Sequence, residues 1–77
     1  MWQDILNKFR RFPAQEKVIR LILQRGFQIN EESRVVSGKI EIPHAQIARE
    51  IDVDRRVVDT TAQAIREDEA LWKIFRN

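Results

Sequence analysis

Few residues in this chain could carry out catalysis. There is no cysteine, and His44 is the single histidine. Ser33 and Ser37 lie in a polar stretch that lacks the glycine-flanked turn around a serine nucleophile. Two glycines are too few for a phosphate-cradling loop, and no carboxylates are spaced to complete a metal site with His44. We therefore expect no enzymatic activity, no cofactor and no metal, with His44 either contacting phosphate from a helix start or lying at the surface.

The side chains best suited to recognising another molecule lie between positions 55 and 63. Arg55 and Arg56 fall in the first turn of an expected helix, where cations oppose the helix dipole, so stability alone does not favour them. Arginine pairs with guanine edges or phosphates, and glutamine pairs with adenine. Asp59 would repel phosphate, so we expect it to accept from a cytosine amine or to orient an arginine. The expected DNA contacts are Arg55, Arg56, Asp59, Thr60 and Gln63, with His44 and Gln46 from the preceding helix.

These residues belong to a stretch, 43–66, that has the size pattern of a helix-turn-helix. Ala48 is small enough for the second helix to approach the first closely. Asp52 stands where most such turns have glycine, and aspartate is one of the few other residues that tolerate the left-handed conformation. Asp54 is a good N-cap for the second helix. The residues expected to anchor the helices and fill the turn are Ile47, Ile51, Val53, Val58 and Thr61.

The whole pattern predicts a mainly α fold with a small β-hairpin, a helix-turn-helix or winged-helix-like domain. Helical periodicity places helices at about 2–12, 13–25, 43–51, 55–68 and 69–76. Pro13 is expected to end the first helix and begin the second, and Gly26 to follow the second in a left-handed conformation.

Alternating apolar residues predict the hairpin over 27–42. We expect Ile40 and Ile42 to pack on the core and Gly38 to mark a bulge. The hairpin precedes the second motif helix, unlike the usual wing, so it is expected to be structural and not to contact DNA as a wing. The expected strands are 27–30 and 35–42.

Composition limits the class of protein. The 77 residues are enough for one domain, 1–77, with a formal net charge of +2. The charge is uneven, because residues 1–26 carry six basic and two acidic side chains whereas 67–69 are all acidic. A basic N-terminal third suits a polyanion partner or an ordinary solvated helix face. Without cysteines, a signal-peptide pattern or a long apolar run, a cytoplasmic location is expected.

The aromatic residues are expected to lie mostly in the core. The four at core spacing are Trp2, Phe9, Phe12 and Phe27. The last helix crowds apolar residues on one face, which could pack on the first helix, on a second copy or on a missing C-terminal domain. We expect a homodimer, since helix-turn-helix proteins usually read two half-sites, with this face helping to form the contact. The residues of that face are Leu71, Trp72, Ile74 and Phe75.

Several segments together resemble one archaeal family of predicted regulators of amino-acid metabolism. They are Trp2 and the runs 12–18, 38–42, 46–49 and 53–58, of which 53–56 is the most specific. Members carry an N-terminal helix-turn-helix and a C-terminal ACT domain. The resemblance implies transcriptional control, with an amino-acid effector bound only by the ACT domain. It also implies that this chain is the N-terminal part of a longer protein.

Two functions remain open from the sequence. The first is sequence-specific binding of double-stranded DNA within a transcription regulator, favoured by Arg55, Arg56 and the resemblance. The second is a helix-turn-helix used for protein contact or dimerisation, favoured by Asp59 and the low net charge. Only the first should weaken steeply with salt, through counterion release.

Overall fold

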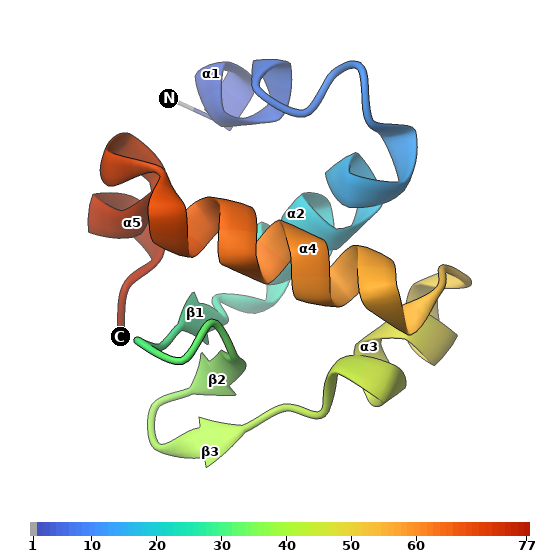
Figure 1. Ribbon diagram of the computed structural model, residues 1–77, viewed down its shortest axis with the longest axis vertical. Helices are drawn as coiled ribbons and strands as arrows, with labels where there is room; N and C mark the ends of the chain where they lie inside the picture. The colour runs from blue at the N-terminus through green and yellow to red at the C-terminus, as the bar shows by residue number, and fades with distance from the viewer. Residues whose placement is uncertain (1) are drawn as a thin grey trace.

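Residues 2–77, which the computed structural model describes, are mainly helical with a small antiparallel sheet (Figure 1). The fold is compatible with the predicted winged helix-like class. None of the helices in this part of the chain is long and apolar enough to cross a membrane. In chain order the elements are α1 (Trp2–Asn7), α2 (Pro13–Arg25), β1 (Gln28–Ile29), β2 (Val35–Ser37), β3 (Ile40–Glu41), α3 (His44–Ile51), α4 (Arg55–Glu67) and α5 (Glu69–Phe75).

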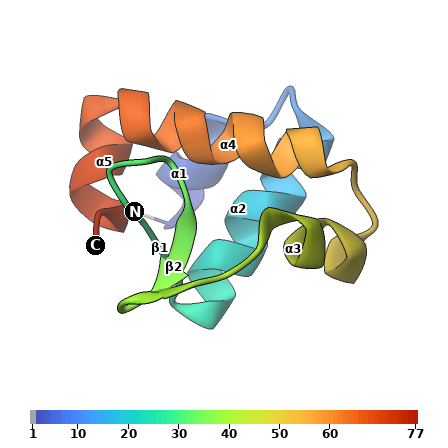
Figure 2. The same ribbon diagram turned by 60° about the horizontal axis from the view of Figure 1, so that its bottom comes forward.

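Helix α4 lies at the centre of the molecule and packs against α2, α3 and α5 (Figures 1 and 2). Its apolar residues recur every three or four positions, which puts them on one stripe of the helix. Val58, Ala62 and Ile65 on that stripe are fully buried. They meet a broad apolar face of α2, which is why these two helices form the centre of the core. The buried residues of α2 are Val18, Ile19, Leu21 and Ile22.

Helix α1 is shorter than the predicted 2–12, because it ends at Asn7 and gives way to turns. The N–H groups of Lys8 and Phe9 bond three residues back, to Ile5 and Leu6. Phe12, the residue before a proline, lies outside the helical region (φ −130°, ψ 77°), so the helix cannot continue to Pro13. The side chain of Phe12 is exposed as a result, and Trp2 is also exposed, so the predicted burial of both is wrong.

The ends of α2 follow the prediction. Pro13 occupies the first turn, where its missing N–H has no partner to lose. Gly26 adopts φ 68° after the last turn. The N–H of Phe27 donates to the carbonyl of Ile22, and that of Gly26 to Leu23, the pairing of a Schellman motif.

The sheet has one more strand than predicted. Ile29 pairs with Val35 between β1 and β2, and Ser37 pairs with Ile40 between β2 and β3. The stretch 35–42 is therefore itself a hairpin that turns at Gly38, and not a single strand. Gly38 has φ 62° at the first position of a two-residue loop, so it marks a turn instead of a bulge.

The predicted burial of Ile40 is also wrong. Its side chain is 69% exposed, because it lies at the tip of the hairpin opposite Ser37, which is exposed too. Ile42, beyond the sheet, packs against the core as expected.

Helix α5 turns back on the core instead of leaving its apolar face free. Asp68 ends α4 and caps α5, its side chain accepting from the N–H of Leu71 at 3.0 Å. Leu71 and Phe75 are buried within their own domain, as one of the three alternatives required, but α5 packs chiefly against α4 and β1 rather than against the first helix. Trp72 is half-buried beneath the guanidinium of Arg66, 4.3 Å from its ring centroid. Leu71 and Phe75 are therefore unavailable for a contact with a second copy.

Candidate nucleic-acid interface

The turn between α3 and α4 positions the candidate interface. Asp52 is left-handed (φ 55°, ψ 55°), as expected at the place where glycine is usual. The N–H of Val53 donates to the carbonyl of Ala48 at 3.0 Å, which satisfies the end of α3. Asp54 caps α4 through the N–H of Arg56 at 2.8 Å. Ala48 is buried, so the two helices meet closely at their corner.

Helix α4 has a buried face and an exposed face. Thr61 is fully buried, and its hydroxyl donates to the carbonyl of Val57 at 2.7 Å, so it can seat the helix without an unpaired polar group. The opposite face is formed by polar side chains, as predicted. The exposed residues of that face are Arg55, Arg56, Thr60 and Gln63.

Both arginines in the first turn are paired with carboxylates. Arg56, whose side chain is 83% exposed, places Nε and Nη2 each 3.2 Å from the carboxylate oxygens of Asp54. The hydrogen bonding between these two side chains is the main cause of a lowered pKa at Asp54 and a raised pKa at Arg56. Arg55, 64% exposed, lies 3.8 Å from Oδ2 of Asp59. The exposed first turn of α4 therefore has little net charge in the free protein.

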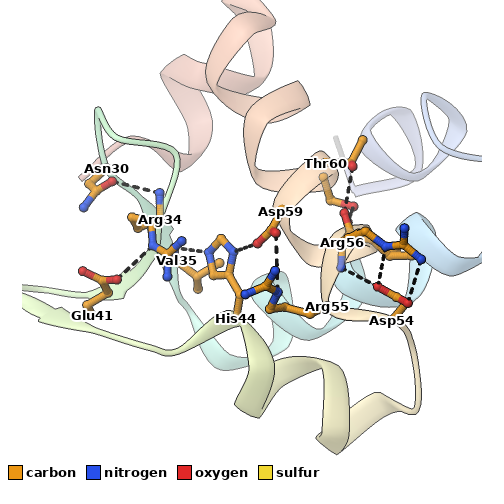
Figure 3. A network of polar contacts seen from close by, with 12 residues as sticks. Asn30, Arg34, Val35, Glu41, His44, Asp54, Arg55, Arg56, Asp59 and Thr60 are labelled. Carbon is orange, nitrogen blue, oxygen red and sulfur yellow. Dashed lines mark hydrogen bonds and ion pairs between the residues drawn. The ribbon is translucent and has the colours of Figure 1, made fainter.

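His44 does not lie at the surface. Its side chain is 2% exposed, beneath the start of α4 (Figure 3). The backbone N–H of Val35 donates to its Nε2 at 3.1 Å. A neutral imidazole that accepts at Nε2 carries its proton on Nδ1, which then donates to Oδ1 of Asp59 at 2.6 Å. Both ring nitrogens are occupied and the ring is covered, so His44 cannot contact phosphate. Neither of its two expected roles, a phosphate contact or a surface histidine, is therefore correct.

The carboxylate of Asp59 lies between His44 and Arg55, with one oxygen toward each. Its place beside Arg55 agrees with the expectation that it orients an arginine. His44 donates to Oδ1, whereas Oδ2 has only the 3.8 Å ion pair with Arg55, so the expected contact with a cytosine amine stays a prediction. The sequence offered one signal for this pairing, the four-residue spacing of Arg55 and Asp59, and none for His44.

The remaining predicted contacts are exposed and hold only local partners. Thr60 donates from its hydroxyl to the carbonyl of Arg56 at 2.7 Å. Gln63 donates to Glu67 at 3.3 Å, and Gln46 accepts from Arg49 at 2.9 Å. The two glutamine contacts join exposed side chains one helical turn apart, and such side chains exchange readily for other partners. Arg49, which the sequence analysis did not select, adds a further exposed cation on α3.

The basic N-terminal segment forms α1, the turns after it and α2, which packs against α4. Within residues 2–77, Arg10, Arg11 and Lys17 make no ion pair. No group of three or more histidine or carboxylate side chains in that range is placed to hold a metal ion. No protein-family model, curated protein or solved structure matches the chain.

Proposed function

We propose that this chain binds double-stranded DNA as a helix-turn-helix domain, with α4 as the recognition helix. In this proposal Arg55, Arg56 and Gln63 face base edges in the major groove, and Thr60 reaches a phosphate or a thymine methyl. The resemblance to the archaeal regulators extends the proposal to control of amino-acid metabolism. An amino-acid effector would then act through an ACT domain outside this chain.

One observation carries the proposal. The first turn of α4 presents two exposed arginines at a helix end where cations are unfavourable, while the opposite face of the helix is buried. These arginines take no part in the core, and their position is unfavourable for stability. Binding of a ligand is therefore a good explanation for their presence. The exposed Arg10, Arg11 and Lys17, which make no ion pair among the described residues, would add phosphate contacts, which fix orientation without reading sequence.

The test is a salt titration of binding to a fluorescent duplex that the parent protein has selected from a random-sequence pool, followed by anisotropy. Affinity should fall with salt, with a log–log slope of about −0.9 for each phosphate contact. Replacing Arg55 and Arg56 with alanine should weaken binding at least about tenfold, because each base-reading arginine contributes about 1–3 kcal/mol. Lys73→Ala is the matched control, since Lys73 is an exposed, ion-paired cation on α5. Equal affinities for the double variant and the parent would refute the assignment of α4.

A second function, protein contact, is favoured by the pairing of charges on α4. Each first-turn arginine already has a carboxylate partner, so the face attracts a polyanion less than its arginine content suggests. A protein partner would bind this balanced face with a weak dependence on salt, which the same titration distinguishes from DNA binding.

The proposal includes a homodimer on DNA, through the exposed apolar side chains near α5. Ile74 on α5 and Trp2 on α1 are both exposed, and the start of α1 lies beside α5 in both ribbon views (Figures 1 and 2). Sedimentation of the parent and of an Ile74→Glu variant tests this. Dimers in the parent that are lost in the variant would support it, and a parent that stays monomeric at high concentration would exclude it for this chain.

A further inference from the structure

We propose that His44 and Asp59 form a positioning pair that fixes the guanidinium of Arg55 on the exposed face of α4. The effect on recognition rests on the proposed DNA binding, whereas the positioning itself is a property of the free protein. Neither His44 nor Asp59 touches the ligand in this proposal.

The fixed end of the pair is the imidazole of His44. Its ring is enclosed, and the donor and acceptor at its two nitrogens differ in kind, which selects one tautomer and one ring orientation. The donor to Nε2 is the N–H of Val35, a fully buried residue of β2. The imidazole is thus held by the sheet and not only by its own helix.

The pair transmits this fixed position to the surface through Asp59. A carboxylate is planar, so holding Oδ1 at 2.6 Å from His44 also restricts where Oδ2 lies. That second oxygen attracts Arg55 across 3.8 Å, one turn earlier on the same helix. The line of contacts from β2 through His44 and Asp59 therefore ends at Arg55 (Figure 3).

The other arginine of the first turn provides an internal comparison. Arg56 also pairs with an aspartate, but Asp54 is exposed and its hydrogen bonds come from Arg56 itself. Arg56 is therefore restrained within its own first turn, by hydrogen bonds at 3.2 Å, whereas Arg55 is restrained by a carboxylate that the buried His44 holds. An arginine restrained before binding loses less freedom when it binds. Removing the charge of Asp59 should accordingly loosen Arg55 and leave Arg56 unchanged.

The first experiment measures order in the free protein. Asp59→Asn keeps an oxygen that can accept from His44 but removes the charge facing Arg55. The heteronuclear NOE at the Nε–H of Arg55 should therefore be higher in the parent than in this variant, whereas that of Arg56 should be the same in both. The ¹⁵N shifts of His44 should report a proton on Nδ1. Equal order of Arg55 in the parent and in Asp59→Asn would overturn the proposal without any reference to DNA.

The second experiment is a double-mutant cycle on binding to the same selected duplex. Arg55→Ala should weaken binding about tenfold in the parent and less than about threefold in Asp59→Asn. Arg56→Ala should have the same effect in both backgrounds, which separates positioning from a general loss of folding. An unchanged effect of Arg55→Ala in the two backgrounds would refute the positioning pair. A parent that does not bind DNA would refute the proposed function alone, since the order measurement still decides the positioning.

Discussion

His44 and Asp59, 15 residues apart in the chain, are joined by a 2.6 Å contact between Nδ1 and Oδ1. This contact connects the first residue of α3 to the exposed side of α4, and the other ring nitrogen of His44 connects both helices to β2. A residue that the sequence presented as a surface group is therefore a junction between three elements.

Replacing His44 with alanine should destabilise the domain by at least about 2 kcal/mol. The change leaves the buried N–H of Val35 without its acceptor and opens a cavity beneath α4. Urea unfolding followed by circular dichroism measures the loss. Gln46→Ala, on the exposed side of the same helix, is the control and should change stability by less than about 0.5 kcal/mol. Equal stability of the two variants would contradict the role given to His44.

The stability of the domain should depend on the charge of Asp68 in acid. The pKa of Asp68 is lowered, chiefly by the N–H of Leu71 and then by the ammonium of Lys8. Stabilisation by a carboxylate with a lowered pKa is fully present above its unfolded pKa, about 3.9, and is lost as the pH falls through the lower folded pKa. Unfolding curves should thus show the parent losing more stability than Asp68→Asn below about pH 4. Parallel pH profiles would show that Asp68 contributes nothing through its charge.

Asp68→Ala should also lose the cap of α5, because alanine has no acceptor for the N–H of Leu71. The expected cost is about 1 kcal/mol at neutral pH. Asn can still accept this hydrogen bond, so Asp68→Asn should cost less. Thermal unfolding of the two variants at neutral pH measures the difference, and a reversed order would contradict the capping role.

The backbone at Asp52 predicts an order of stability among its variants. With φ at 55°, a β-branched side chain at this position would clash, whereas glycine fits freely. Asp52→Val should lose about 1–2 kcal/mol, and Asp52→Gly should be at least as stable as the parent. Melting temperatures of the three proteins provide the test. A valine variant as stable as the parent would mean that the turn adopts another conformation.

The neighbouring residues Ile74 and Phe75 should respond in opposite ways to truncation. Phe75 is buried, so Phe75→Ala should cost about 3–5 kcal/mol and leave a domain of this size largely unfolded. Ile74 is 43% exposed, and Ile74→Ala should cost less than about 1 kcal/mol. Denaturant unfolding of both variants distinguishes packing within one chain from packing between chains. Comparable losses would mean that the face of α5 is buried differently.

Features that depend on short-range chemistry could be predicted from the sequence. The left-handed Asp52, the Asp54 cap and the glycine after α2 each follow from the conformational preferences of one residue and its neighbours. The inner stripe of α4 follows from helical periodicity, because the buried positions recur with the turn of the helix.

Features that depend on distant elements could not be predicted. Phe12 and Ile40 have apolar side chains at plausible core spacing, and only the end of α1 and the turn at Gly38 leave them exposed. The burial of His44 requires the N–H of Val35 and the carboxylate of Asp59 to meet around it. No pattern along the chain specifies that meeting, so the polar contact that shapes the candidate site was visible only in the fold.

The central place of α4 gives it a distinct dynamic behaviour. Because α2, α3 and α5 all pack on it, its inner turns cannot open while the rest of the domain stays folded. Amide protons of Ala62 and Ile65 should therefore exchange with deuterium only through global unfolding, whereas those of the short α1 should exchange through local opening. The helix that presents Arg55 would then reach a ligand as a rigid body, without a folding step upon binding.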